Sequence, residues 1–382
     1  MQKTSCILLL HVMVSLLFSL PLQARVSFID SGQNLEGSFP FESGYHVVLS
    51  DIDGDNDLDA YVTQTDGWGD RVWFNNGQGV FVMGSNSPSN PYSRQAAMKD
   101  LDGDNDVDLF TTNYNGPNKI YLNDGQGRFS DSGQSVGVTA HYGVVLGDLD
   151  KDGDHDAFIS RSGANTIWLN DGSATFTDTT QTLGSADTAR TCLGDLDGDG
   201  DLDAFCANSG QADRVWLNNG SAVFTDSGQS LGALGSMDAV LEDVDRDGDL
   251  DAYVVQVNAP DTLWLNNGSA TFSDSGQSFG SGYSRSASLA DLDGDGDPDL
   301  FLVRSGGTTP CNMVFINNGH GVFTDSGLRL GVSASQAAAL GDLDRDGDPD
   351  AFVVNHAQPD KIWLNVSVPA GYLPGILMIL TP

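Results

Sequence analysis

A nine-residue acidic stretch recurs seven times along the chain, and it constrains the fold more than any other feature. In the copy from Asp195 to Asp203 the sequence is DLDGDGDLD, with aspartate at every odd position. In an ordinary extended strand these five carboxylates would crowd onto one face with no neutralising charge. Position six is Gly in five copies and Asn in two, and both residue types tolerate a positive φ. We therefore expect a tightly turning loop that needs a cation.

Oxygen ligands at alternating positions of a loop suit calcium, which takes six to eight oxygens, although sodium or magnesium in some loops stays an alternative. An EF-hand loop begins similarly but requires a Glu at position twelve and a helix on each side. Position twelve is instead a residue such as Val62 or Leu302, in short apolar runs that are typical of strands. A disordered acidic tract would lack these repeated apolar partners. The sequence therefore predicts up to one calcium ion per loop.

The predicted metal-ligating residues are the five aspartates of each loop. In chain order they are Asp51, Asp53, Asp55, Asp57 and Asp59; Asp100, Asp102, Asp104, Asp106 and Asp108; Asp148, Asp150, Asp152, Asp154 and Asp156; Asp195, Asp197, Asp199, Asp201 and Asp203; Asp243, Asp245, Asp247, Asp249 and Asp251; Asp291, Asp293, Asp295, Asp297 and Asp299; and Asp342, Asp344, Asp346, Asp348 and Asp350.

These loops also explain the formal net charge of -36. They contribute 35 of the 53 acidic residues, so the remaining 18 nearly balance 17 Lys and Arg. The acidity is thus local to the predicted metal sites. With no basic stripe in the sequence, nucleic acid is not expected as a partner.

The N-terminal residues predict export, and the C-terminal residues predict a short tail. Residues 1–24 combine Lys3, an apolar run from Cys6 to Leu20 and a small residue at Ala24, the layout of a secretory signal peptide cleaved after Ala24. The alternative, a membrane anchor, would require a longer apolar run. Residues 367–382 are expected to form a tail or an extra edge strand, with a remnant of a longer sorting signal as an alternative. Their apolar run from Ile376 to Leu380 is too short to span a bilayer. We expect a secreted or cell-surface protein, with the periplasm as an alternative.

The cysteines leave two interpretations open. Removal of the signal peptide would leave three, of which Cys192 and Cys206 flank one acidic loop. They either form a disulfide across the hairpin, with Cys311 unpaired, or are small core residues.

Two further motifs repeat with the loop at a spacing of about 48 residues. An aromatic-aliphatic-Asn strand such as Trp216-Leu217-Asn218 follows each loop start by about 21 residues, and an Asn-Gly or Asp-Gly turn follows in six units. The third motif, Phe-x-Asp-Ser-Gly in its complete form, is missing from the last unit. A copy instead stands before the first loop, at Phe28 to Gly32.

This offset predicts a closed ring. A linear solenoid would end in capping repeats, whereas a ring whose first strand completes its last unit leaves no open edge. Four short strands in about 48 residues is the size of one propeller blade. We therefore predict an all-β, seven-bladed β-propeller over residues 25–366, closed by Val26 to Asp30 pairing with Ile362 to Asn365. The repeated aromatics are predicted to form the core between blades.

The acidic loop between two strands, repeated through seven units, resembles the FG-GAP and VCBS repeat proteins, which include the integrin alpha-subunit propeller. The resemblance covers residues 25 to 366. It implies that loop positions one, three, five and nine bind calcium through their side chains and position seven through its backbone carbonyl.

Ligand recognition is expected on the face opposite the acidic loops, where the units differ most. Aromatic side chains beside hydrogen-bonding groups suit sugars or peptides. The candidates are Trp68, Tyr92, Tyr114, Tyr142, His141, Tyr283, Arg94, Arg161, Arg190, Arg285 and Arg304. The leading hypothesis is a calcium-binding adhesion or binding module for an extracellular protein or glycan. The alternatives are a lectin or a carbohydrate-active enzyme similar to polysaccharide lyases, and a structural display domain of a surface assembly. No catalytic signature occurs, so enzymatic activity is not expected.

Overall fold

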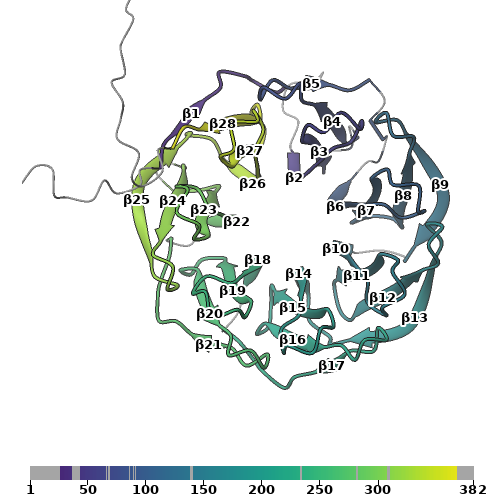
Figure 1. Ribbon diagram of the computed structural model, residues 1–382. Helices are drawn as coiled ribbons and strands as arrows, with labels where there is room; N and C mark the ends of the chain where they lie inside the picture. The colour runs from purple at the N-terminus through teal and green to yellow at the C-terminus, as the bar shows by residue number, and fades with distance from the viewer. Residues whose placement is uncertain are drawn as a thin grey trace, which may run out of the picture.

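Seven four-stranded sheets form a closed ring (Figure 1). The computed structural model describes residues 26–36, 44–65, 67, 69–85, 87–88, 90, 92–137, 141–232, 235–280, 283–307 and 310–367. Within these residues all regular structure is β, as predicted, and no helix is long and apolar enough to cross a membrane. The predicted signal peptide, Trp68 and all of the predicted tail except Ser367 lie outside the described residues.

The chain runs through the blades in order, from the innermost to the outermost strand of each. Blades one to three contain β2 (Gly44–Ser50), β3 (Asp59–Gln64), β4 (Arg71–Phe74) and β5 (Val82–Met83); β6 (Ser93–Lys99), β7 (Asp108–Asn113), β8 (Asn118–Asn123) and β9 (Phe129–Val136); and β10 (His141–Gly147), β11 (Asp156–Arg161), β12 (Asn165–Asn170) and β13 (Phe176–Leu183).

Blades four to seven contain β14 (Thr188–Gly194), β15 (Asp203–Asn208), β16 (Arg214–Leu217) and β17 (Thr225–Asp226); β18 (Ser236–Glu242), β19 (Asp251–Gln256), β20 (Thr262–Leu265) and β21 (Ser273–Asp274); β22 (Ser284–Ala290), β23 (Asp299–Arg304), β24 (Asn312–Asn317) and β25 (Phe323–Leu330); and β26 (Ser335–Gly341), β27 (Asp350–Asn355), β28 (Lys361–Asn365) and β1 (Phe28–Asp30).

The last blade confirms the predicted closure. β1 pairs antiparallel with β28, and Phe28, Ile29 and Asp30 lie opposite Asn365, Leu364 and Trp363. The first strand of the chain is therefore the outermost strand of blade seven, and the two ends of the propeller are hydrogen-bonded to each other.

The hydrophobic core consists of seven clusters, and each lies between two neighbouring blades. The second strand of each blade, such as β3 or β19, is buried along its whole length or nearly so, because blades cover both of its faces. The repeated Trp side chains belong to or pack against these clusters, for example Trp73 between blades seven and one. The prediction that they form the interblade core is confirmed.

Each innermost strand carries a β-bulge near its start. In blade one the register shifts between Gly44 and His46, so Tyr45 has no partner on β3, and all seven blades show a shift at this place. Bulges bend a strand and change the direction of a side chain. Here they lie at the end of the innermost strands opposite the acidic loops.

The three cysteines of the described residues, Cys192, Cys206 and Cys311, are free thiols, so the disulfide alternative is wrong. Thr191, not Cys192, lies opposite Cys206 in the β14–β15 register. Cys192 is therefore one residue out of register and belongs to a different interblade cluster from Cys206. Cys206 is a core residue, and Cys192 is partly buried against its cluster and lines the central channel. Burial raises the pKa of each thiol to about 12.

Candidate metal loops and the channel-mouth pocket

Each acidic loop connects the first strand of its blade to the second. In blade one β2 ends at Ser50, one residue before the loop, and β3 begins at Asp59, its ninth position. The same bounds recur in all seven blades, so the seven loops lie at one end of the ring.

Two positions of the loop have a positive φ. Position six was predicted from its Gly and Asn residues, and φ is 67° at Asn56 and 99° at Gly153. Position four was not predicted, because three blades place a long basic residue there, Lys151, Arg246 and Arg345, with φ of 63° to 65°.

The loop folds around its first aspartate. The backbone N–H groups of Gly54 and Asn56 donate to the two carboxylate oxygens of Asp51, at 2.8 and 3.0 Å. This bend brings carboxylates together: one oxygen from each of Asp51, Asp53 and Asp59 lies within 4.8 Å of the others. Equivalent groups of positions one, three and nine occur in the second, third and fifth loops, and one of positions one, three and five in the fourth.

The ninth aspartate joins the loop to the rest of its blade. Asp59 is fully buried and accepts hydrogen bonds from the N–H groups of Ile52 at 3.0 Å and Asn75 at 2.8 Å. Burial raises its pKa to about 7, although these two hydrogen bonds act in the opposite direction. The other six loops repeat this arrangement, with pKa values raised to about 6 or 7.

Buried carboxylate oxygens of the acidic loops show whether the loops fit a cation. Oδ1 of position three is buried and without a donor within the described residues at Asp53, Asp102, Asp150 and Asp245. Buried anionic oxygens without donors are costly unless a cation neutralises them. Because the ligand atoms of the groups named above are all carboxylate oxygens, these residues fit a hard cation.

Position seven has a different side-chain role. The Asp57 carboxylate packs against Gly77 in the turn after β4, where a Cβ atom would lie 2.6 Å from Oδ1. In three blades this aspartate also pairs with the basic residue at position four of the preceding loop, as in Arg345 to Asp57. Its side chain therefore joins blades, while its backbone carbonyl is the predicted ligand.

The Asn of the aromatic-aliphatic-Asn motif links neighbouring loops. The Asn75 backbone N–H bonds to Asp59 in its own loop, and its Nδ2 donates to the carbonyl of Leu343, position two of the preceding loop, at 2.8 Å. All seven blades repeat the link. The loops therefore form one hydrogen-bonded circle.

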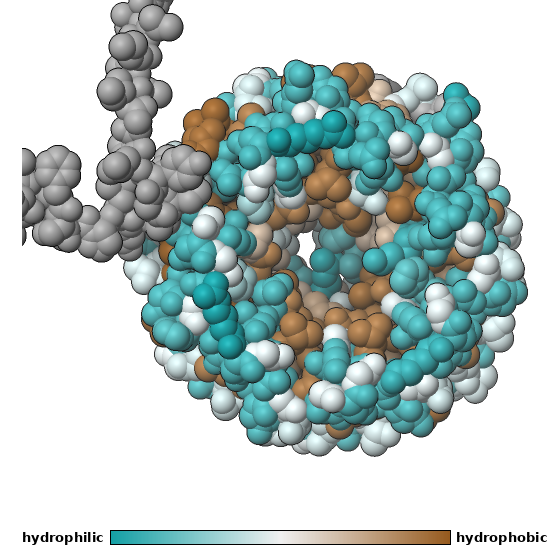
Figure 2. Space-filling model, viewed as in Figure 1, coloured by the Kyte–Doolittle hydropathy of each residue, from teal (hydrophilic) through white to brown (hydrophobic). Residues whose placement is uncertain are grey.

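The innermost strands surround a central channel (Figure 2). Apolar side chains line much of it, including Val47, Leu49, Leu193 and Leu241, around a volume of about 560 Å³. Figure 2 shows hydrophobic residues around the central opening and hydrophilic residues over most of the surrounding surface.

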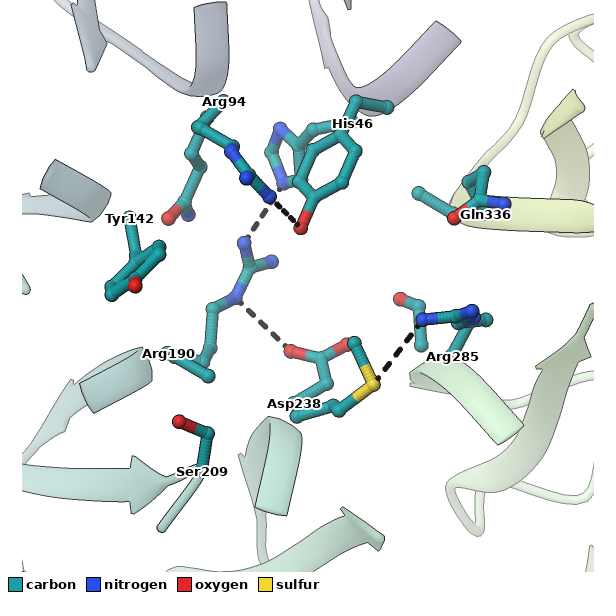
Figure 3. A pocket seen from close by; sticks show the side chains of 14 residues that line it. His46, Arg94, Tyr142, Arg190, Ser209, Asp238, Arg285 and Gln336 are labelled. Atoms are coloured by element: carbon teal, nitrogen blue, oxygen red, sulfur yellow. Dashed lines mark hydrogen bonds and ion pairs between the residues drawn. The ribbon is translucent and has the colours of Figure 1, made fainter. Parts of the chain in front are cut away.

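A second cavity of about 220 Å³, which we call the channel-mouth pocket, lies at the bulged ends of the innermost strands (Figure 3). Every blade contributes to its lining. The residues are Tyr45, His46, Arg94, Gln95, Tyr142, Ala189, Arg190, Ser209, Met237, Asp238, Arg285, Ser286, Gln336 and Ala337.

Two side-chain networks order this pocket. The Arg94 guanidinium lies 4.9 Å from the ring centre of Tyr45 and 4.8 Å from that of Tyr114, and it donates to the Tyr45 hydroxyl at 2.8 Å. Arg190 pairs with Asp238 at 3.1 Å and contacts Nε2 of His46 at 3.0 Å. Burial, and then the charge of Arg190, lowers the His46 pKa well below its usual 6.5.

The structure divides the candidates for ligand recognition. Arg94, Tyr142, Arg190 and Arg285 line the pocket, and Tyr114 contacts Arg94. Tyr92 and Tyr283 are exposed but do not line it. Arg161 and Arg304 do not line it either. His141 is buried, and its pKa is lowered to about 4 by burial and then by Arg161, so it is not a surface residue.

Sequence reasoning missed Tyr45, His46, Gln95, Met237, Asp238 and Gln336. The available signal was their shared place, about six residues before each acidic loop, where the repeat is least regular.

Comparison with known families agrees with the repeat geometry. A family model described as FG-GAP-like repeat matches residues 100–159, 148–203, 195–254, 243–302 and 291–353. The chain belongs to the FG-GAP-like repeat family. No curated protein matches the sequence.

Solved structures that resemble this FG-GAP repeat protein share its fold at low sequence identity. An Agrocybe aegerita lectin with specific recognition of non-reducing terminal N-acetylglucosamine is 19% identical over 84% of this chain and 87% of its own, with a TM-score of 0.53. BBS1N, in complex with ARL6DN, is 14% identical over 89% and 97%, with a TM-score of 0.63. The BP39L lectin of Burkholderia pseudomallei is 13% identical over 85% and 96%, with a TM-score of 0.58.

Proposed function

We propose that this protein is a secreted or cell-surface binding module whose ring is stabilised by calcium and whose channel-mouth face binds a glycan or protein ligand. One observation carries the proposal: the acidic loops are alike in all seven blades, whereas the residues at the other end of the innermost strands differ from blade to blade. Repeated residues build the ring, and unrepeated ones are free to recognise a partner. The proposal assigns no enzymatic activity and no nucleic-acid partner.

Calcium is supported by the ligand chemistry. The loops combine clustered carboxylates, buried oxygens without donors and no nitrogen or sulfur ligand in the groups described. Calcium takes oxygen ligands in flexible geometry, and weak multi-carboxylate sites fill at the millimolar concentrations outside cells. Export through the predicted signal peptide would place the loops in that environment.

Glycan binding is supported by the residues of the pocket and by the similarity of the fold to lectins. Two of the similar structures are lectins, one of which recognises a terminal sugar. The channel-mouth pocket combines tyrosine rings with arginine and amide groups, a combination suited to sugar faces and hydroxyls.

Calorimetric titration of calcium into the chelator-stripped protein tests the metal part of the proposal. Near seven ions should bind, with a rise in melting temperature, because binding to the folded state alone stabilises it. The double substitution Asp197→Ala and Asp199→Ala should remove about one ion. Asp226→Ala, an exposed aspartate on β17, is the matched control. Unchanged stoichiometry in the double variant would refute the ligand assignment.

Screening the calcium-loaded protein against glycan and protein panels tests the binding part. Substitution of channel-mouth residues should abolish ligand binding, and substitution of residues at the acidic-loop end should leave ligand binding intact. Binding that depends on neither end, or no binding at all, would refute the proposal.

A further inference from the structure

The channel-mouth pocket is positively charged in a strongly acidic protein. Its lining contains three arginines, Arg94, Arg190 and Arg285, against one carboxylate, Asp238, for a formal charge of +2. His46 contributes no charge near neutral pH, since its pKa is lowered by burial and by Arg190. Three of the 17 basic residues of a chain with net charge -36 thus converge on one cavity.

The three arginines are not equally available. Arg190 is paired with Asp238. Arg94 donates to the Tyr45 hydroxyl, and Arg285 donates to Ser305 Oγ at 2.7 Å and contacts Met237 Sδ at 3.5 Å. Among the described residues no carboxylate pairs with either. A guanidinium group has five N–H donors in a planar fork that matches a carboxylate, so both retain unused donors.

Arg94 is held in place by aromatic rings. The rings of Tyr45, Tyr114 and Tyr142 have their centres 4.8 to 5.8 Å from its guanidinium carbon, and Tyr114 and Tyr142 lie 6.1 Å apart at 37°. Tyr114 is 41% exposed, so one ring of this cage is open to solvent. A flat ring beside an available guanidinium can cover the apolar face of a sugar whose acid group meets the arginine.

The size and shape of the pocket favour one sugar residue over a longer chain. Its volume of about 220 Å³ is below the roughly 300 to 1,000 Å³ of sites for drug-sized ligands. Residues from all seven blades line it and converge from different sides (Figure 3). Extended peptides are held along sheet edges or grooves, and this pocket has neither form.

We propose that the channel-mouth pocket binds a carboxylate-bearing sugar, a uronic acid residue of an acidic glycan. Arg94 pairs with the carboxylate, and the rings of Tyr45 and Tyr142, which line the pocket, contact the sugar ring. Arg285 approaches from another side of the pocket and adds to the positive potential (Figure 3). The inference rests on the proposed binding function and narrows its ligand to one chemical class.

Calorimetric titration of the calcium-loaded full chain tests this inference. The probes are glucuronic and galacturonic acid and their short oligosaccharides, compared with glucose and galactose, all in buffers of matched free calcium. The uronic acids should bind at least tenfold more tightly than the neutral sugars, and this preference should weaken with added salt. Melting temperatures confirm that each variant is folded.

Substitutions of single arginines separate the roles. Arg94→Gln should weaken uronic acid binding about tenfold or more, because a charge-assisted bidentate pair is lost. Arg285→Gln should cause a smaller loss, mainly at low salt. Arg128→Gln is the matched control, since Arg128 is exposed and does not line the pocket.

Equal affinity for neutral and acidic sugars, or full uronic acid binding by the Arg94→Gln variant, would overturn the inference. An acidic peptide that binds through Arg94 while uronic acids do not would also overturn it, yet leave the proposed binding function standing. If no glycan or protein ligand depends on the channel mouth, the proposed function itself fails.

Discussion

At the scale of single residues, the ninth aspartate of each acidic loop serves the fold as well as the predicted metal. Asp59 accepts two backbone hydrogen bonds while fully buried. Asp55, at position five, is exposed and accepts one, from the N–H of Asp57 at 2.9 Å. Two aspartates of one loop therefore differ in what their removal should cost.

Asp59→Ala should destabilise the protein by about 2 to 4 kcal/mol even in chelator, because two buried N–H groups lose their acceptor. Asp55→Ala should cost less than about 1 kcal/mol in chelator, yet both should weaken calcium binding at this loop. Denaturant unfolding with and without calcium measures this. Equal costs in chelator would contradict the structural role of position nine.

A buried aspartate outside the acidic loops lies in blade four, between β15 and β16, at the end opposite the acidic loop. Asp213 accepts from the Asn208 N–H at 2.8 Å and from Ser236 Oγ, in the next blade, at 2.9 Å. Burial raises its pKa from the usual 3.8 to about 7. In blade three Asn165 holds the same place, accepting from the Arg161 N–H and donating to Thr188 Oγ1.

Asp213→Asn should therefore change how stability depends on pH. The folded state holds its proton up to a pH of about 7, whereas the unfolded state loses it near 4, so wild-type stability falls between these values as pH rises. The variant lacks this titration. Its free energy of unfolding, relative to that of the wild type, should therefore rise by about 1 to 3 kcal/mol between pH 5 and pH 8.

Unfolding at saturating calcium across this range checks the result. The reverse substitution, Asn165→Asp, should introduce a similar fall in stability. A constant difference between Asp213→Asn and the wild type at all pH values would show that the Asp213 pKa is not raised.

At the scale of single residues, the sequence predicted those features that recur at the same position of every repeat. Position six needed no structure, because only Gly and Asn occupy it. The positive φ of position four was hidden by Lys151, Arg246 and Arg345. Lys151 and Arg246 pair with aspartates about 50 positions further along the chain, and Arg345 pairs with Asp57 across the ring closure. Six pocket residues, Tyr45 and His46 among them, were missed because bulges in the innermost strands re-aim side chains there, and a bulge leaves no regular pattern in a single sequence.

At the scale of structural elements, glutamine side chains join the outer strands of neighbouring blades. Gln181 follows the third motif of blade three. Its Nε2 donates to the Ala222 carbonyl and its Oε1 accepts from the Phe224 N–H, each at 2.8 Å. Four further glutamines repeat this clasp: Gln33, Gln134, Gln229 and Gln277.

Replacing Gln181 with Ala should cost about 1 to 2 kcal/mol, because it removes two hydrogen bonds between blades. Gln126→Ala, a substitution in the turn before β9, should be neutral. Equilibrium unfolding of both variants makes the comparison. A neutral Gln181→Ala variant would mean that the clasp adds nothing beyond the apolar contacts around it.

The clasp shows why the elements were easier to predict than their connections. Short apolar runs, Asn-Gly turns and a repeat of about 48 residues indicated four strands per unit from the sequence alone. The glutamine recurs just as regularly, but its partners lie 41 to 48 residues away, in the next blade. A single sequence records that the residue repeats, not what it contacts.

At the scale of the whole molecule, the ring closes at one seam, the pairing of β1 with β28 in blade seven. Sequence alone predicted this seam, because a motif missing at one end was found at the other. In the structure Phe28 packs edge-to-face on Phe301 at 5.8 Å and belongs to the cluster between blades six and seven. The ion pair of Arg345 with Asp57 and the link from Asn75 to Leu343 join blade seven to blade one.

Two equivalent phenylalanines allow the seam to be tested. Phe272 occupies the same motif position in blade five, packs on Phe205 at 5.5 Å and is as buried as Phe28. Either Phe→Ala substitution should cost about 3 to 5 kcal/mol for lost packing. Ile29→Ala, beside Phe28 but 49% exposed, should cost less than about 1 kcal/mol.

Only Phe28→Ala should also release the first strand. Among the described residues, β1 is connected by chain to another strand only at its C-terminal end and pairs only with β28, whereas β21 of blade five lies between β20 and β22 in the chain. Brief proteolysis of the folded, calcium-loaded variants should therefore cut near residues 26–32 in Phe28→Ala and leave the Phe272→Ala ring intact. Deleting Val26 to Asp30 should destabilise the ring strongly, since it exposes the edge of β28 and removes part of the core between blades six and seven. An unchanged melting temperature for that deletion, or equal cleavage of the two Phe variants at the N-terminal strand, would mean that β1 does not hold the ring closed.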